Sequence, residues 1–63
     1  MTVGELRTLV DYDTVLWIET AEEEYLEAGE ADGLSHKYDS YSIGRMFVQH
    51  YPSLFTHGIT VQI

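Results

Sequence analysis

The chain has 63 residues, enough for a single small domain, and its composition excludes several classes of protein. A domain of about 60 residues buries only about 60% of its unfolded surface, so the core is small. Eleven acidic and three basic residues give a formal net charge of −8, which disfavours direct binding to nucleic acid or anionic lipid and favours a basic partner. There is no cysteine, so disulfides and thiolate metal sites are excluded, while 44% hydrophobic residues argue against a disordered acidic tail.

The sequence also lacks the usual membrane and export signals. No apolar run approaches the roughly 20 residues of a membrane-spanning helix. The N-terminus has neither the basic nor the apolar region of a signal peptide. We therefore expect a cytoplasmic protein with one domain over residues 1–63. Since neither a disulfide nor an evident metal site stabilises so small a core, we also expect dimerisation or a bound partner.

The first predicted element is a helix over residues 2–10. Thr2 and Glu5 form a capping box, with the threonine at the N-cap and the glutamate three residues later. Four apolar residues recur at helical spacing and form one face: Val3, Leu6, Leu9 and Val10. Residues 11–13 end the helix with turn-forming side chains. This helix is expected to pack on a sheet.

Residues 14–19 are predicted to form the first strand, because they are β-branched and aromatic and too few for a helix. Their apolar run is nearly continuous, which indicates a central strand that is covered on both faces. We therefore place Trp17 in the core rather than on a ligand-binding surface.

An acidic stretch follows over residues 19–32, with seven carboxylates among fourteen residues and no basic residue. Two local structures compete for its first half. The helix propensity of Ala, Glu and Leu, and a capping pattern that begins at Thr20, favour a helix. The alternative is a turn near residues 21–22 and a strand over about residues 24–28, which ends at Gly29. We adopt the strand because of the resemblance described below.

The second half of the chain contains two further predicted strands. Asp32-Gly33 indicates a turn, and residues 34–40 indicate a loop with one helical turn. Residues 41–50 are predicted to form a buried strand, with an amphipathic helix over residues 43–50 as the alternative. The residues that indicate the buried strand are Ile43, Met46, Phe47 and Val48. Gly44 suggests a bulge or a close backbone approach there.

The chain is expected to break at residues 51–53 and to turn again at His57-Gly58. Residues 59–63 then alternate as a last strand whose inward side chains are Ile59, Val61 and Ile63. The resulting order predicts an α+β domain, in which an N-terminal helix packs on a small, mainly antiparallel sheet of three to four strands with a short helical turn in the middle.

Four stretches of the chain resemble small proteins of bacterial phages and mobile elements. They are Thr2-Val3-Gly4-Glu5-Leu6, Tyr12-Asp13-Thr14-Val15, Glu27-Ala28-Gly29-Glu30-Ala31-Asp32 and Gly58-Ile59-Thr60-Val61-Gln62-Ile63. In the same order, they are similar to four parts of those proteins: the capped helix, the Asp-containing turn that leads into the first strand, the second strand, and the last strand. The resemblance spans most of the chain through generic motifs, and it implies a phage-borne accessory protein in a bacterial host cell. Some small acidic phage proteins of this appearance are anti-CRISPR inhibitors that occupy nucleic-acid sites on Cas effectors, so the resemblance also implies, more narrowly, such an inhibitor.

No motif in the sequence indicates an enzyme. The acidic stretch lacks the loop pattern of an EF-hand, and its crowded charges indicate solvent rather than the apolar pocket of a general acid. The three histidines have no ligand-like spacing: His36, His50 and His57. There is no Walker sequence, glycine-rich phosphate loop or G-x-S-x-G elbow. We expect no catalytic activity, no cofactor and no bound metal.

The acidic stretch instead suggests nucleic-acid mimicry. Strand or helix spacing places its charges about 5–7 Å apart, an interval of the same order as that between successive phosphates. Tyrosine is enriched at interface hot spots, and two tyrosines flank charge. We predict that ten residues contact a basic, nucleic-acid-binding partner such as a Cas effector: Glu19, Glu22, Glu23, Glu24, Tyr25, Glu27, Glu30, Asp32, Tyr38 and Asp39.

Two alternatives to mimicry remain open. The acidic stretch is equally explained as a solvated surface that only keeps the protein soluble. The protein is also explained as a small structural module without an inhibitory role. In that case residues 59–63, or the strand that contains Phe47, pair across a twofold axis to form a homodimer.

Overall fold

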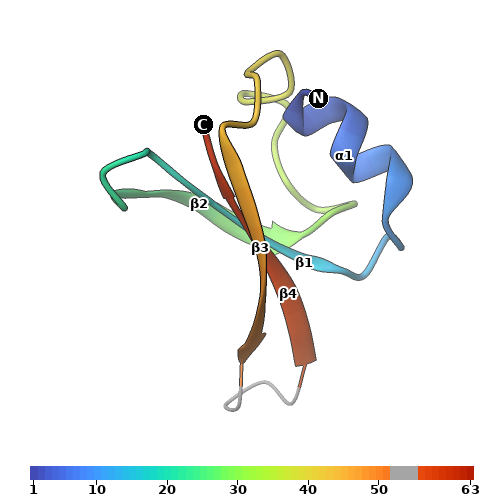
Figure 1. Ribbon diagram of the computed structural model, residues 1–63. Coiled ribbons are helices and arrows are strands. Elements are labelled where there is room, and N and C mark those ends of the chain that lie inside the picture. The colour runs from blue at the N-terminus through green and yellow to red at the C-terminus, as the bar shows by residue number, and fades with distance from the viewer. Residues whose placement is uncertain (52–55) are drawn as a thin grey trace.

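The computed structural model describes residues 1–51 and 56–63 and confirms the predicted α+β fold. One N-terminal helix lies against a four-stranded, mostly antiparallel sheet (Figure 1). Its elements are α1 (Val3–Leu9), β1 (Val15–Glu19), β2 (Tyr25–Glu30), β3 (Arg45–Tyr51) and β4 (Thr56–Gln62). Pro52 and Ser53, which belong to the predicted break, lie outside the described residues.

Helix α1 begins with the capping box that the sequence predicts. The Thr2 side chain accepts a hydrogen bond from the Glu5 amide, and the Glu5 carboxylate accepts one from the Thr2 amide. The face that includes Leu9 was predicted to be buried, and this is wrong for Leu9, whose side chain is 70% exposed. The reason is that the chain becomes extended at Val10, so Val10 packs against the core in its place. Within the described residues, no helix is long and apolar enough to cross a membrane.

The sheet has the strand order β2-β1-β4-β3, with β1 and β4 parallel at its centre. This confirms that β1 is a central strand and that the last strand is part of the sheet. The predicted turn at His57-Gly58 is wrong, because β4 already begins at Thr56 and Gly58 pairs with residues of both neighbouring strands. Since β4 is paired on both sides, it cannot extend the sheet to a second copy.

The core lies between α1 and one face of the sheet. Its buried residues come from α1, β1, β4 and the segment that follows β2: Val3, Leu6, Leu16, Ile18, Ala31, Leu34 and Val61. The inward alternation of the last strand is confirmed, because Val61 is fully buried and Ile59 and Ile63 pack against this cluster. Among the residues whose burial is described, none from β2 or β3 belongs to the buried cluster itself. The core is therefore centred on β1 and β4.

Among the described residues, no helix covers the opposite face of the sheet, and one prediction fails for that reason. Trp17 alternates with the buried Leu16 and Ile18, so it points to the uncovered face and is only half-buried. The prediction that Trp17 lies in the core is therefore wrong, although no residue of β1 is exposed.

The strand predicted near residues 41–50 is confirmed, but its predicted burial is wrong. Strand β3 forms, which excludes the helical alternative, but it is an edge strand. Three of its apolar side chains are exposed: Met46, Phe47 and Val48. Ile43, before the strand, does pack against the core. Gly44 makes a close backbone approach to β4, because its amide donates to the Gln62 carbonyl at 2.7 Å.

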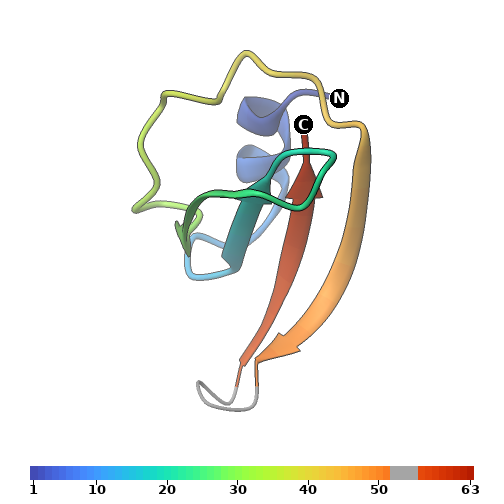
Figure 2. The ribbon, with the colours of Figure 1, turned by 90° about the vertical axis from the view of Figure 1, so that its left-hand side faces the viewer.

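The long connection between β2 and β3 runs beside α1 (Figures 1 and 2). Turns closed by Asp39 N–H to His36 O and Tyr41 N–H to Tyr38 O take the place of the single helical turn expected there. The free amides of the first helical turn donate to this connection, Val3 to Tyr41 O at 3.0 Å and Gly4 to Asp39 O at 2.9 Å. A Cβ atom at position 4 would lie 3.0 Å from that Asp39 oxygen, so any side chain there would push the two segments apart by a few tenths of an ångström.

Candidate functional site

The acidic stretch forms two separate clusters, one at each end of β2. The strand prediction for its first half is confirmed, so the helical alternative is excluded. The first cluster, which we call the hairpin cluster, consists of the exposed Glu22, Glu23 and Glu24 in the β1–β2 connection. Thr20 organises this connection, because its hydroxyl oxygen accepts hydrogen bonds from the amides of Glu22 at 3.2 Å and Glu24 at 3.1 Å. The hairpin cluster is thus held in a defined turn.

Glu23 adopts a strained backbone conformation in this turn. Its φ of 68° lies in the left-handed region, and it is the only non-glycine residue with positive φ in the described part of the chain. Such a conformation costs a non-glycine residue roughly 1–2 kcal/mol. Strain of this kind concentrates at functional sites, which makes a glutamate at this position informative.

Replacing Glu23 with glycine is therefore expected to raise the free energy of unfolding by up to about 1 kcal/mol, since glycine adopts positive φ without steric cost. Urea unfolding of the wild type and of Glu23→Gly measures the difference. Glu22→Gly, at the neighbouring exposed position, serves as the control and should not stabilise the protein. Equal effects of the two substitutions would show that φ at position 23 is not strained.

The second cluster, which we call the turn cluster, lies at the other end of β2. Its exposed members are Asp11, Asp13, Glu30 and Asp32. Backbone hydrogen bonds join the two segments that carry it, from the Asp32 amide to Tyr12 O at 3.0 Å and from the Ala31 amide to Thr14 O at 2.8 Å. Sequence reasoning missed the two aspartates near residue 12, because only strand pairing brings them beside Glu30.

An aromatic pair lies beside the hairpin cluster. The rings of Trp17 and Tyr25 are 4.9 Å apart between centroids and inclined by 58°. Tyr25 directly follows Glu24 and is 57% exposed. Aromatic faces next to carboxylates suit an arginine or lysine side chain, which gains a cation–π contact in addition to its ion pair. The hairpin cluster is thus followed directly by an exposed aromatic ring.

Four of the predicted contact residues are engaged inside the protein. Glu19 is 8% exposed, and its carboxylate accepts a hydrogen bond from Gln62 Nε2 at 2.7 Å. The Glu27 carboxylate accepts hydrogen bonds from the Ser35 amide at 3.2 Å and from its hydroxyl at 2.8 Å.

Tyr38 and Asp39 complete this group. Tyr38 is half-buried against the core, with its ring edge-on to that of Tyr41. Asp39 lies 2.8 Å from Arg7 Nη1. The six exposed predicted contacts are Glu22, Glu23, Glu24, Tyr25, Glu30 and Asp32.

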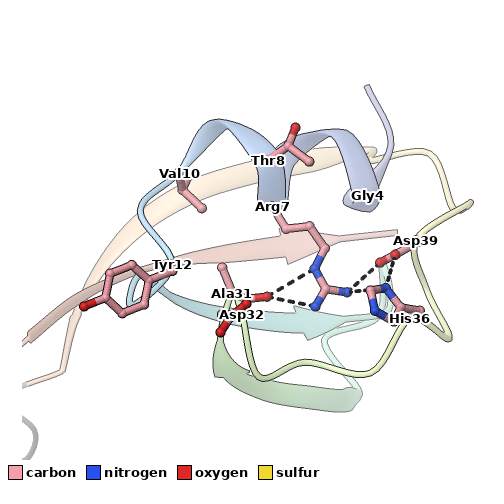
Figure 3. Close-up of a pocket in the computed structure, with 9 residues that line it drawn as sticks. All are labelled: Gly4, Arg7, Thr8, Val10, Tyr12, Ala31, Asp32, His36 and Asp39. Carbon is pink, nitrogen blue, oxygen red and sulfur yellow. Dashed lines mark hydrogen bonds and ion pairs between the residues drawn. The ribbon is translucent and has the colours of Figure 1, made fainter.

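Arg7 joins α1 to the segment after β2 (Figure 3). Its guanidinium donates five hydrogen bonds, one for each N–H group. The acceptors are Ala31 O, which is contacted twice at 3.1 and 2.8 Å, Leu34 O at 2.7 Å, Ser35 O at 2.9 Å and Asp39 Oδ1 at 2.8 Å. A cleft of about 320 Å³ lies beside this network. Because every guanidinium donor is already used, Arg7 has none left for an anionic ligand in the cleft.

Asp39 makes the network sensitive to pH. The Nδ1 atom of His36 lies 2.7 Å from Asp39 Oδ2. Hydrogen bonds from the His36 ring, and then from the Arg7 guanidinium, hold the pKa of the Asp39 carboxyl below its usual value. Because the folded-state pKa is lowered, the stabilisation is complete above the unfolded-state pKa of about 3.9 and is lost as the pH falls through the folded-state value.

We therefore expect Asp39→Asn to be less stable than the wild type at neutral pH, and the difference to shrink as the pH falls below about 4. Urea unfolding of both proteins across the range from neutral to about pH 3 measures it. The difference between the two proteins isolates Asp39 from the other carboxylates, which titrate in both. A difference that stays constant over the whole range would contradict the assignment.

The described residues offer the hairpin cluster no internal counterion. Their only ion pairs within 4.0 Å are those that Arg7 and His36 form with Asp39. In the same part of the chain, no three His, Asp or Glu side chains are grouped so that they could hold a metal ion. The hairpin cluster is thus an uncompensated charged surface. Comparison with known proteins assigns no family, because no protein-family model, curated protein or solved structure matches the chain.

Proposed function

We propose that the protein is an acidic binding protein that occupies a basic, nucleic-acid-binding surface of a partner in the cytoplasm of a bacterial host. The observation that supports this is the hairpin cluster, whose three exposed carboxylates have no ion-pair partner among the described residues. The exposed ring of Tyr25, packed on Trp17, adds an aromatic anchor beside these charges. A surface that binds phosphates presents the arginine and lysine side chains that such a combination attracts.

The two acidic clusters give the protein two contacts on such a surface. Glu24 and Glu30 are separated by six residues of nearly extended chain, roughly 20 Å at about 3.4 Å per residue. This is about six base-pair steps along a DNA duplex, whose rise is about 3.4 Å per step. Continuous mimicry along the strand is not supported, because the Glu27 carboxylate between the clusters is bound to Ser35. We propose that the hairpin cluster is the main contact and the turn cluster a second one.

The resemblance to phage proteins makes a Cas nuclease the most concrete partner, and the protein is then an anti-CRISPR inhibitor. The test is a displacement assay, in which fluorescently labelled DNA is bound to a guide-loaded Cas nuclease and the wild-type protein is added. Proteins that bind single-stranded DNA and proteins that bind double-stranded DNA are assayed in parallel. We expect the DNA to be released from at least one of them, with an affinity that falls steeply as salt is raised. Failure to release DNA from any of them, or a displacement unaffected by salt, would contradict the proposal.

A further inference from the structure

We propose that β3 is a self-association edge, at which two copies of the chain pair antiparallel about a twofold axis and form one continuous sheet. Strand β3 is the last strand of the sheet, on the far side from β2 (Figure 2). Among the described residues no strand pairs with its outer edge. This inference is independent of the acidic surface and does not rest on the proposed function.

The backbone of β3 is suited to pair with another strand. It pairs with β4 in an unbroken register from Arg45 to Tyr51, without a bulge. Alternate residues of an edge strand direct their backbone N–H and C=O groups away from the sheet. This row of groups can form a regular ladder of hydrogen bonds with a further strand. Protective lysines and prolines are absent from residues 45–51. A twofold axis perpendicular to the sheet makes the new pair antiparallel.

Side chains on both faces of β3 remain exposed. Met46 and Val48 pair with Val61 and Ile59, so they share the face that α1 covers elsewhere. They are nevertheless 48% and 73% exposed, because the helical layer ends before it reaches this edge. Phe47 is exposed on the other face. Pairing with a second strand would bury apolar surface on both sides of the sheet.

The charge distribution favours a second copy of the chain over a basic partner as the occupant of β3. Residues 45–51 contain no carboxylate, whereas both acidic clusters adjoin the opposite edge strand β2. A basic partner is therefore attracted to β2 and not to β3. Joining two copies through β3 separates their β2 strands by seven strand spacings, roughly 34 Å at about 4.8 Å each. That is several times the Debye length of about 8 Å at physiological salt, so the repulsion between the two acidic chains is largely screened.

Sedimentation equilibrium tests the proposal with a matched pair of variants. The wild type is expected to form dimers at physiological salt, and lowering the salt should weaken them, because the repulsion between chains of charge −8 is then screened less. Val48→Lys brings two lysines to the paired edge and should weaken dimerisation about tenfold or more. Leu9→Lys adds the same charge at an equally exposed apolar residue on α1, 70% against 73%, and should leave the dimer intact. Circular dichroism verifies that both variants are folded.

Each other outcome overturns the proposal. A wild type that stays monomeric up to millimolar concentration excludes self-association. A folded Val48→Lys variant that dimerises like the wild type excludes β3 as the edge, and equal weakening by Leu9→Lys shows that added charge alone is responsible. A foreign strand as the occupant would appear as a monomeric wild type whose binding to another protein is lost only in Val48→Lys. The salt dependence is opposite to that expected for the proposed function, so the two proposals fail in distinguishable ways.

Discussion

Replacing Arg7 with alanine is expected to lower the free energy of unfolding by roughly 3–5 kcal/mol, the largest stability effect of any single substitution considered. The substitution removes an ion pair with Asp39 and leaves three backbone carbonyl groups without their donor, those of Ala31, Leu34 and Ser35. At about 0.05–0.15 kcal/mol per residue, a domain of 63 residues has a stability of roughly 3–9 kcal/mol, so this loss removes about a third of it or more. Urea or thermal unfolding measures the change.

Two control variants separate the network from charge alone. Arg7→Lys keeps the charge but cannot reproduce the planar set of five donors, so we expect an intermediate loss. Arg45→Ala removes an exposed arginine on β3 that forms no ion pair with the described residues, and it should change stability by less than about 0.5 kcal/mol. If Arg7→Ala is as stable as Arg45→Ala, the segment after β2 is held to α1 by packing alone and the role given to Arg7 is wrong.

Reversing the charge of the hairpin cluster is expected to weaken partner binding by about 100-fold or more, since each charge pair in contact contributes on the order of 1 kcal/mol or more. The variant carries Glu22→Lys, Glu23→Lys and Glu24→Lys. All three side chains are exposed, so the fold should be unaffected. The displacement assay with labelled DNA measures the loss of affinity.

The turn cluster supplies a control of equal charge. Asp11→Lys, Asp13→Lys and Asp32→Lys together also raise the net charge by six, so both triple variants have a formal charge of −2 in place of −8. We expect the turn-cluster variant to lose about tenfold or less, because it leaves the hairpin cluster and Tyr25 intact. Equal losses would mean that binding follows net charge and not a defined surface. Two variants that both bind like the wild type would show that the acidic residues only keep the protein soluble.

Local signals were sufficient to predict much of the fold. The capping box of Thr2 and Glu5 and the apolar spacing of Val3 and Leu6 predict α1, because a helix end is determined by residues close in sequence. The alternation over residues 59–63 likewise predicts the last strand. For β2, propensity alone favoured a helix, and the turn organised by Thr20 together with pairing to β1 overrides it.

Features that depend on strand order could not be predicted in this way. Phe47 and Val48 have the composition of a buried strand, but β3 lies at an edge beyond the reach of α1. Glu19 and Asp39 resemble their exposed acidic neighbours in sequence, and only their partners Gln62 and Arg7 remove them from the surface. The turn cluster is likewise created by the pairing of β1 with β2. Contacts between distant residues thus decide which carboxylates remain available.

The location of the partner on the protein tests the central claim most directly. The chain is labelled with ¹⁵N, and its amide signals are recorded while an unlabelled nucleic-acid-binding protein from the displacement assay is added. We expect the signals of residues 20–25 and of the Trp17 indole to change first, those near Asp11 and Asp32 to change less, and those of α1 to stay unchanged. Changes confined to α1 or β3, with the hairpin cluster unaffected, would contradict the proposal that this acidic hairpin binds the partner.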